Sequence, residues 1–597
     1  MPASVRPMIE VAETEPRIGY CAINMNQPPP RHTGTEPPAV PLAIRGEDAA
    51  AAGLALPGAA GAALGGAGLD LTAARERLLR WAAFAPAVFY LLVILAPPLN
   101  HDVAAVLNFA ERWLAGERLY RDLIDVNPPL IFVLNLVPAA LGAWTPLDSV
   151  QALLLCVLGL CALCWRLTLA LLRGAAGAAR QGPIESAVMR AMVPMVLVVA
   201  AYDFAQREHI MATVALPYCA LAARRIAGVA PPPRRLAFGV ALLAALGFAL
   251  KPHFLAVPTL VEAVVLLHRG PMRALRDPVP WLMAAVWLVY VAAIPLFFPD
   301  YFGFVVPLVW AYYLDIAEFS AWEVLISPIL GPAALALAVV LPVALLRRGA
   351  GPLAQTLAAA ALGALVSAVV QHKGWTYHAI PVTMLTAAAA AAALSRWLDR
   401  VLSSDGAAAT AAAGRAGDHR VTVAPVAAAV ATIGLGLYAA HGGEAPWREL
   451  WFHGDRAGRI AAFVKREAYG ERLLVLSPDI YPVYPALNYA HARSTLRTMN
   501  LWLLQGVYRT CPQNGERYRE TWEMSRAEFF VYRTVAEDFA RTPPAAVLVS
   551  RNPGIPWCGG EFDFIEYFTR HPLFAETWER YRPAGEIEGY RLFVREE

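Results

Sequence analysis

Two acidic motifs in this sequence carry the residue types that proton transfer requires. His101 and Asp102 follow a long apolar segment, and the motif YRDLIDVNPP at 120–129 contains Asp122 and Asp125. A positioned carboxylate can act as a general base and accept the proton of a hydroxyl group. The sequence therefore offers three candidate catalytic residues: Asp102, Asp122 and Asp125.

Three further motifs combine basic, imidazole and amide side chains: QREH at 206–209, KPH at 251–253 and QHKGWTYH at 371–378. Cationic donors form charge-assisted hydrogen bonds with phosphate. A single Lys or Arg at the end of an apolar segment is better explained by a side chain that reaches for lipid headgroups. Simple anchoring does not require neighbouring His and Gln residues, so the set favours one phosphate- or substrate-binding site. Its candidate members are His101, Arg207, Glu208, His209, Lys251, His253, His372, Lys373, Tyr377 and His378.

Structural roles compete with catalysis for the aspartates. Asp102 precedes apolar residues at helical spacing that stop at Gly116, so a helix N-cap explains it about as well as a general base does. For Asp125, a turn before Asn127 and two prolines is slightly the better explanation. Asp102 with the other two aspartates is also an alternative site for a divalent metal. This loop has no DxD cluster, so the metal is not favoured, and neither a metal ligand nor a cofactor is assigned.

Long apolar helices must position these motifs. The chain is 58% hydrophobic and only 16% charged, whereas a soluble domain typically has about 25% charged residues. Crossing the hydrocarbon layer takes roughly 20 apolar residues in a helix. One segment is long enough for two passes, which gives about eleven spans in total. The segments are 81–99, 149–172, 191–205, 209–223, 237–267 (two passes), 280–298, 326–346, 353–370, 378–395 and 422–441.

The arginines predict the orientation of these spans. Arg75, Arg77 and Arg80 precede the first span and should hold its N-terminal end in the cytoplasm. The basic clusters between later spans then fall on the same side, as the positive-inside rule requires. All five polar motifs and residues 442–597 are consequently expected on the opposite, outer side. The later clusters are Arg173, Arg180 and Arg190; Arg224, Arg225, Arg234 and Arg235; Arg269, Arg273 and Arg276; Arg347 and Arg348; Arg396 and Arg400.

One apolar segment, 128–143, does not fit as a full span. Counting it as a crossing would invert every later loop, and the segment is short and interrupted by Pro138. We expect a helix that lies in or dips into the outer leaflet as part of the first outer loop, 100–148. Irregular backbone at membrane depth is tolerated only where protein covers it or a water-filled cavity faces it. The segment is therefore predicted to lie beside a site.

The last part of the chain has a different character. Short apolar strands alternate with helices, which is typical of a small α/β domain, and neither GxGxxG nor a P-loop occurs there. Cys511 and Cys558 are the two cysteines of this part, and a disulfide between them is an option if the domain is exported. The expected helices are 459–467, 527–540 and one near 562–570, and the expected strands are 473–476, 545–550 and 590–594.

The predicted organisation has three parts. Residues 1–74 are rich in Pro, Ala and Gly and are expected to form a disordered cytoplasmic tail. Residues 75–441 form the transmembrane domain, and residues 442–597 form an extracytoplasmic α/β domain. The expected fold class is mainly α: a polytopic helical membrane bundle with a soluble α/β domain at its C-terminus.

The first outer loop resembles the opening of C-type membrane glycosyltransferases. An Asp just after the first span is followed by an amphipathic helix that ends in GERLYRD at 116–122, and then by DVNPPL at 125–130. The branch it resembles is glycosyltransferase family 39-like and contains protein O-mannosyltransferases and the lipid A aminoarabinose transferase. The resemblance covers roughly residues 81–441.

This resemblance implies a glycosyltransferase at the outer face of the bacterial cytoplasmic membrane. It would move a sugar from a polyprenyl-phosphate donor to an acceptor hydroxyl on a glycan, lipid or protein, with inversion at the anomeric carbon. Asp102 would be the general base, at the place where the family usually has the first residue of an Asp-Glu pair. Val103 replaces the Glu, which puts metal binding in doubt. Arg207, Lys251 and Lys373 would be candidates for the donor phosphate.

Two other functional classes are weighed against this one. A polysaccharide polymerase or ligase, or a lipid-linked-sugar flippase, would use a lipid carrier without this donor chemistry. An ion or solute transporter would require ionisable groups near mid-bilayer and often repeated halves, and the sequence shows neither. No Lys/Arg-rich tract suggests nucleic acid. The expected partners are the lipid-linked sugar, its acceptor and membrane lipids.

Overall fold

A computed structural model describes residues 71–596 except 174–176, 315, 318, 348, 410–417, 442–450 and 514. The predicted tail 1–74 lies outside the described residues up to residue 70, and a helix already begins at Leu71. The described chain is mainly helical, with one small sheet near its C-terminus. This confirms the fold class expected from the sequence.

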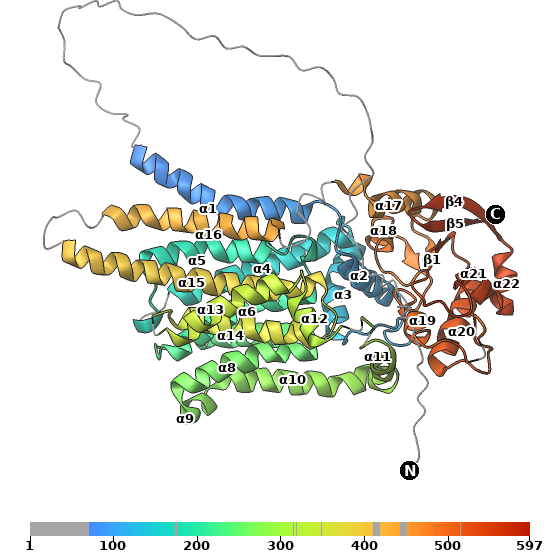
Figure 1. Ribbon diagram of the computed structural model, residues 1–597, viewed down its shortest axis with the longest axis horizontal. Helices are drawn as coiled ribbons and strands as arrows, with labels where there is room; N and C mark the ends of the chain where they lie inside the picture. The colour runs from blue at the N-terminus through green and yellow to red at the C-terminus, as the bar shows by residue number, and fades with distance from the viewer. Residues whose placement is uncertain are drawn as a thin grey trace, which may run out of the picture. The chain divides into compact units, whose positions relative to one another are not determined.

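Each predicted span overlaps a helix, although some bounds differ by several residues, and these helices run side by side (Figure 1). Among the described residues, six helices are long and apolar enough to cross a membrane. Large apolar side chains such as Leu288 and Leu335 are about 70% exposed on the outside of the bundle, which indicates a surface that faces lipid. The protein is therefore a multi-pass membrane protein. The helices are α1 (Leu71–Leu95), α4 (Ser149–Arg173), α5 (Pro183–Val198), α6 (Arg207–Ile226), α7 (Arg234–Phe248), α8 (Ala256–Arg269), α10 (Pro278–Phe297), α13 (Gly331–Leu346), α14 (Pro352–Val369), α15 (Thr376–Ala409) and α16 (Asp418–His441).

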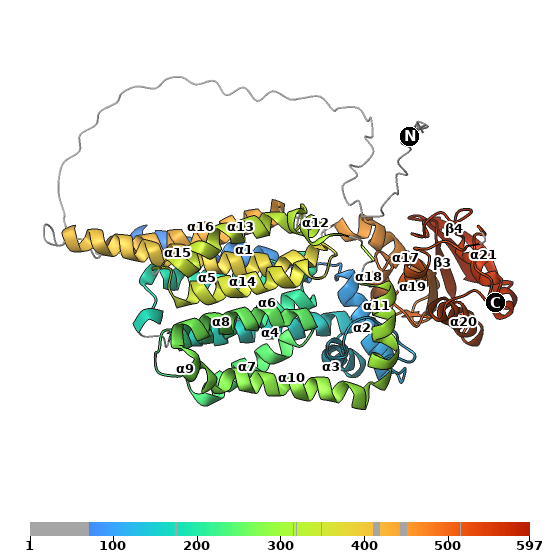
Figure 2. The ribbon, with the colours of Figure 1, turned by 60° about the horizontal axis from the view of Figure 1, so that its bottom comes forward.

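Shorter helices cover one end of the bundle (Figures 1 and 2). Two of them follow α1: α2 (His101–Leu114) and α3 (Leu130–Trp144). Helix α3 crosses the end of the bundle (Figure 2) and packs against α2 and α4, so the segment 128–143 is helical as expected and does not run along the spans. Helix α2 buries its apolar face and ends before Gly116, which adopts a positive φ of 104°. Two further short helices, α11 (Val306–Tyr312) and α12 (Ala321–Ile326), lie between α10 and α13.

The C-terminal part contains a five-stranded sheet in the order β2-β1-β3-β5-β4, flanked by short helices. Strand β1 pairs in parallel with β2 and β3, and β5 is antiparallel to β3 and β4. All the expected strands and helices are present, but the sequence did not indicate β2 or β4. Strand β4 is mostly exposed, so it lacks the apolar alternation that marks a strand. The strands are β1 (Arg472–Leu476), β2 (Arg493–Ser494), β3 (Ala546–Ser550), β4 (Tyr581–Ile587) and β5 (Tyr590–Arg595), and the helices are α17 (Arg456–Glu467), α18 (Val483–Tyr489), α19 (Trp502–Val507), α20 (Arg526–Arg541), α21 (Phe564–Thr569) and α22 (Pro572–Trp578).

Reciprocal hydrogen bonds join this domain to α2. Asn108 Nδ2 donates to the carbonyl of Ala492 (3.1 Å), and Asn488 Nδ2 donates to the carbonyl of Ala104 (3.0 Å). All four residues are buried, where a hydrogen bond has little competition from water. The first loop and the C-terminal domain therefore form one packed unit at the end of the bundle that carries α2.

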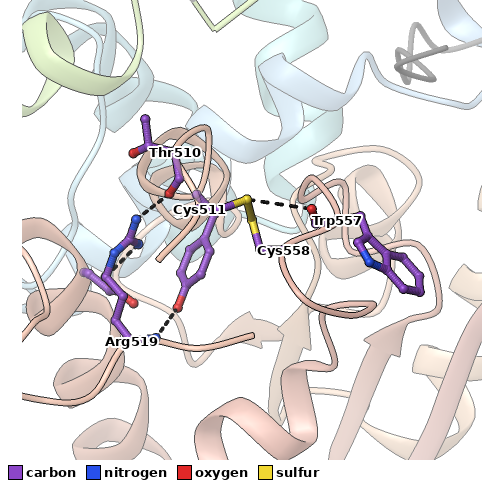
Figure 3. Close-up of a disulfide and its surroundings, with 7 residues drawn as sticks. Thr510, Cys511, Arg519, Trp557 and Cys558 are labelled. Atoms are coloured by element: carbon purple, nitrogen blue, oxygen red, sulfur yellow. Dashed lines mark hydrogen bonds and ion pairs between the residues drawn. A yellow bond between two sulfur atoms is a disulfide. The ribbon is translucent and has the colours of Figure 1, made fainter. Parts of the chain in front are cut away.

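Cys511 and Cys558 form a disulfide in the C-terminal domain (Figure 3). The bond joins residues 47 positions apart in sequence, and closing a loop of this size restricts the unfolded chain. We expect the double substitution Cys511→Ser and Cys558→Ser to lower the stability of the domain by about 2–4 kcal/mol. Thermal unfolding of the purified protein under non-reducing conditions measures this. The control is Cys156→Ser, which changes a free cysteine; equal melting temperatures for all three proteins would contradict the prediction.

Candidate functional site

Asp102 lies in the first turn of α2, but it is not the N-cap residue of this helix. The N-cap residue is Asn100, whose Oδ1 accepts hydrogen bonds from the backbone N–H groups of Asp102 (3.0 Å) and Val103 (3.4 Å). The interpretation of Asp102 as an N-cap is therefore wrong, because the amide two residues earlier satisfies the free N–H groups of the helix. The carboxylate of Asp102 lies in the first turn and is available for other partners.

Arg207 and Gln206, at the start of α6, contact this carboxylate. Arg207 Nη2 lies 3.6 Å from Asp102 Oδ2, and Gln206 Nε2 donates to the same oxygen at 3.4 Å. Gln206 Nε2 also donates to Asn100 Oδ1 (2.8 Å). The amide of Gln206 therefore bonds both the N-cap residue Asn100 and the carboxylate of Asp102. Two segments separated by about a hundred residues thus meet at Asp102, as the outer-face grouping of HD and QREH predicted.

His101 lies on the other side of the carboxylate. Its Nε2 is 3.7 Å from Asp102 Oδ1, and its Nδ1 is 2.9 Å from the hydroxyl of Tyr202. The ring of Tyr481, from the C-terminal domain, packs edge-on against His101 with centroids 6.0 Å apart. Burial lowers the pKa of His101 more than Asp102 raises it, so His101 is neutral near pH 7 and contributes a polar ring rather than a fixed charge.

The charge of Asp102 is set by its surroundings. Burial acts to raise the pKa of Asp102, but the combined influence of His101, Arg207 and the hydrogen bond from Gln206 outweighs it, and the pKa lies below its usual value. The carboxylate is therefore ionised at neutral pH. An ionised, rigidly held carboxylate has the protonation state that a general base needs.

Asp125 does not contact Arg207 directly but holds Asn127, which does. Asp125 Oδ1 accepts hydrogen bonds from the backbone N–H (2.8 Å) and Nδ2 (2.7 Å) of Asn127, and Asn127 Oδ1 in turn accepts from Arg207 Nη1. Burial raises the pKa of Asp125, although the bonds from Asn127 oppose this. The turn expected here is present, and its effect is to hold the guanidinium of Arg207 in front of Asp102.

A second buried ion pair joins the three cationic motifs. Lys251 Nζ donates to Glu208 Oε1 (2.6 Å) and to Gln371 Oε1 (3.3 Å), and it lies 5.4 Å from the centroid of the Tyr377 ring. QREH, KPH and QHKGWTYH therefore meet, as predicted. Lys251 and Glu208 are both more than nine-tenths buried, so a carboxylate already offsets the charge of this lysine.

The remaining members of the cluster are aromatic and imidazole groups. Lys373 Nζ lies 3.1 Å from the ring centroid of Tyr313 and 4.7 Å from that of Trp375. The ring of His378 packs against Trp375 and Tyr377. Within the part of the chain that the structure describes, neither nitrogen of His378 has a hydrogen-bond partner, and His253 Nε2 and Glu208 Oε2 also have none. Buried polar atoms of this kind are candidates for contacts with a bound polar group.

Three predicted residues make other contacts. Asp122 pairs with Arg118 (2.9 Å) at the turn after α2. His209 is fully buried, with Nε2 2.8 Å from the carbonyl oxygen of Leu197. The Nδ1 of His372 lies 2.9 Å from the carbonyl oxygen of Phe319. Each of these contacts stabilises local structure: a turn at Asp122, the packing of α6 at His209 and a loop at His372. The structure therefore does not bring these three side chains to Asp102.

A small, shallow cleft adjoins Asp102. Its polar side is formed by Asp102, Gln206 and Arg207. Its apolar side comes from α2 and α3. The complete lining is Asp102, Val103, Val106, Ile131, Asn135, Ala205, Gln206 and Arg207.

Some polar residues of the site were not predicted, although most of them lie next to residues that were. Gln206, Gln371 and Asn127 lie inside the motifs that drew attention, next to residues that were chosen. Asn100 directly precedes His101 and Asp102, and Asn is a preferred N-cap residue. Tyr313, in contrast, lies in a loop without any motif, so only the three-dimensional structure reveals its contact with Lys373.

A metal site formed by the aspartates is not supported by their contacts. Asp102 faces Arg207 and Asp122 faces Arg118, whereas metal-binding carboxylates converge on one point. Among residues 71–596 that the structure describes, no three His, Cys, Asp or Glu side chains are arranged to hold a metal ion.

The Lys251–Glu208 pair yields a stability prediction. Lys251→Met leaves the carboxylate of Glu208 buried without its cation, and breaking a buried pair in this way costs about 3–5 kcal/mol. We therefore expect a clearly lower unfolding temperature in detergent. Adding Glu208→Gln removes the stranded charge and should restore much of the loss. Lys465→Met, at an exposed position of α17, is the control. Unfolding of Lys251→Met at the wild-type temperature would show that the pair does not stabilise the bundle.

Two solved structures of ArnT, a lipid A aminoarabinose transferase from Cupriavidus metallidurans, share this fold. The one bound to undecaprenyl phosphate gives a TM-score of 0.52, and the one in the apo state gives 0.53. In both cases the identity is 12%, and the match covers 88% of this chain and 98% of the other. No family model and no curated protein matches the sequence. The resemblance seen in the first loop is thus confirmed as a likeness of fold over most of the chain.

Proposed function

We propose that this protein is a glycosyltransferase of the C-type membrane class that uses a polyprenyl-phosphate-linked sugar as its donor. The observation that carries the proposal is the position of Asp102, which lines the cleft and contacts His101, Gln206 and Arg207. The fold agrees, because it is shared with a transferase solved with undecaprenyl phosphate. The enzyme acts as a hexosyl- or glycosyltransferase on a glycan, lipid or protein acceptor.

The proposed step is a single inverting displacement. The acceptor hydroxyl attacks the anomeric carbon, a new C–O bond forms, and the bond between that carbon and the phosphate oxygen breaks. The hydroxyl proton passes to the carboxylate of Asp102 as general base. The polyprenyl phosphate leaves with the bonding electron pair, and Arg207 stabilises the negative charge that develops on it.

Arg207 is better placed for the phosphate than Lys251. A guanidinium has five N–H donors in a planar fork, and Asn127, Gln206 and Asp102 hold this one from several directions. Lys251 already donates hydrogen bonds to Glu208 and Gln371. Its role is therefore to form a charge-neutral ion pair with Glu208 beside the site. Lys373, which makes cation–π contacts with Tyr313 and Trp375, adds a third positive charge.

The proposed topology puts the site on the outer face of the bacterial cytoplasmic membrane. The polar motifs lie at the bundle end that carries α2, and contacts such as that of Arg225 with Asp277 lie near the other ends of α6 and α10. The disulfide in the C-terminal domain suits an oxidising compartment. Residues 75–441 then form the membrane domain, and 442–597 form an extracytoplasmic domain that closes over the first outer loop, 100–148. Residues 1–74 remain in the cytoplasm.

Consumption of donor tests this proposal. Purified protein is incubated with undecaprenyl phosphate that carries a labelled hexose or aminoarabinose, together with an envelope extract as acceptor source. Release of bare undecaprenyl phosphate with transfer of the label supports the proposal. A polymerase or ligase would act on other lipid-linked intermediates, and a flippase would move the lipid across a vesicle membrane with its sugar bond intact. Either of these outcomes, without donor consumption, would overturn the proposal.

A further inference from the structure

Helix α3 contributes one polar side chain to the cleft beside Asp102. Asn135 lines the cleft together with the apolar residues Ile131 and Val106, and it is 94% buried (6% exposed). The segment around it, LIFVLNLVPAALGAW, is otherwise apolar. A lone amide in such a helix is costly to bury unless both its polar atoms have partners, so its bonding is informative.

Half of this amide is satisfied within α3. Asn135 Nδ2 donates to the carbonyl of Ile131 at 2.8 Å. Because that partner is an acceptor, the nitrogen and not the oxygen must face it. The remaining atom, Oδ1, is buried and has no hydrogen-bond partner among the residues that the structure describes. The cleft is therefore lined by a residue whose amide oxygen is an unused acceptor.

We propose that Asn135 Oδ1 accepts a hydrogen bond from a hydroxyl or amino group on the sugar of the lipid-linked donor. The proposal rests on the proposed function and extends it from the phosphate to the sugar. Arg207 and Asp102 line the same cleft, and the proposed function assigns the phosphate to Arg207 and the reaction at the anomeric carbon to Asp102. The apolar side chains of Val106 and Ile131 suit the C–H face of a sugar ring. An amide oxygen in the same lining discriminates between a ring that presents a hydrogen-bond donor to it and one that does not.

Asn108 provides a matched control on the neighbouring helix. It is also buried, its Nδ2 also donates to a single carbonyl, and its Oδ1 also has no partner among the described residues. It does not belong to the lining of the cleft. A general effect of replacing a half-bonded buried asparagine should therefore be seen at both positions, and an effect on sugar binding only at Asn135.

The test compares two lipids without acceptor. Native mass spectrometry of the full-length protein gives the dissociation constants for undecaprenyl phosphate and for undecaprenyl phosphate that carries glucose, mannose or aminoarabinose. For the sugar that wild type prefers, we expect Asn135→Leu to bind the glycosylated lipid about three- to tenfold more weakly, as expected for one lost hydrogen bond. Binding of the bare lipid should stay within twofold. Asn135→Asp keeps an acceptor oxygen and should keep the ratio of the two constants.

The outcomes separate the inference from the proposed function. An unchanged ratio in Asn135→Leu, or an equal change in Asn108→Leu, would overturn the role of Asn135 while leaving donor binding intact. Failure of the wild-type protein to bind either lipid would instead overturn the proposed function itself. Because the measurement omits the acceptor, an effect through the acceptor site would leave the ratio unchanged and would count against the inference.

Discussion

Replacing Asp102 by asparagine should lower the rate of glycosyl transfer by about 10²–10⁴-fold, the usual contribution of a general base. The amide has the same shape as the carboxylate but cannot take up the acceptor proton. The helix should persist, because Asn100 caps α2 in place of Asp102. The rate is measured as release of undecaprenyl phosphate from the glycosylated donor, alongside the unfolding temperature of the variant.

The control for this experiment is Asp122→Asn. Asp122 is a carboxylate of the same outer loop, but its partner is Arg118 and it is about one-third exposed. We expect its activity to stay within about twofold of wild type, since exposed ion pairs contribute little. If Asp102→Asn retained full activity in well-folded protein, or if both variants lost it equally, Asp102 would not be the base.

Arg207→Gln is expected to show the second large effect. Loss of one preorganised group that stabilises transition-state charge typically lowers kcat by about 10²–10³-fold. The same change should also alter the pH dependence. Arg207 is one of the groups that hold the pKa of Asp102 below its usual value, so its removal raises that pKa. Asp102 is then protonated at a higher pH, and the acid side of the pH–rate profile should move to higher pH.

Arg190→Gln provides the control for Arg207. Arg190 is an exposed arginine of α5 that donates hydrogen bonds to Ser186 within its own helix, so neither the rate nor the pH profile should change. A loss of rate in Arg207→Gln without any shift of the acid limb would mean that the guanidinium does not act on Asp102. That result would separate phosphate binding from control of the carboxylate.

The helices could be predicted from sequence because the signal for them is local. Runs of apolar residues with arginine at alternate loops define the spans, and the segment 237–267 divides into α7 and α8 at KPH as expected. The segment 128–143 was likewise expected to be a helix that does not span the membrane, and α3 crosses the end of the bundle. Strand β4 was missed because its residues are exposed and include Pro583 and Gly585, which are unfavourable in strands.

The predicted topology led us to expect that the polar motifs converge, but it did not indicate how their side chains pair. Grouping by side of the membrane brought Asp102, Arg207 and Lys251 together correctly. It did not reveal that Glu208 neutralises Lys251 or that Asn100 frees Asp102 from a capping role. Such pairings depend on how helices α2, α6 and α7 approach one another, and side-chain type and spacing along one chain do not specify that approach.

The most direct test of the account is to locate the phosphate of bound undecaprenyl phosphate by electron cryo-microscopy of the full-length protein. We predict phosphate density within hydrogen-bond distance of the guanidinium of Arg207, at the cleft beside Asp102. Phosphate density at the opposite end of the bundle, near Arg224 and Arg396, would contradict it.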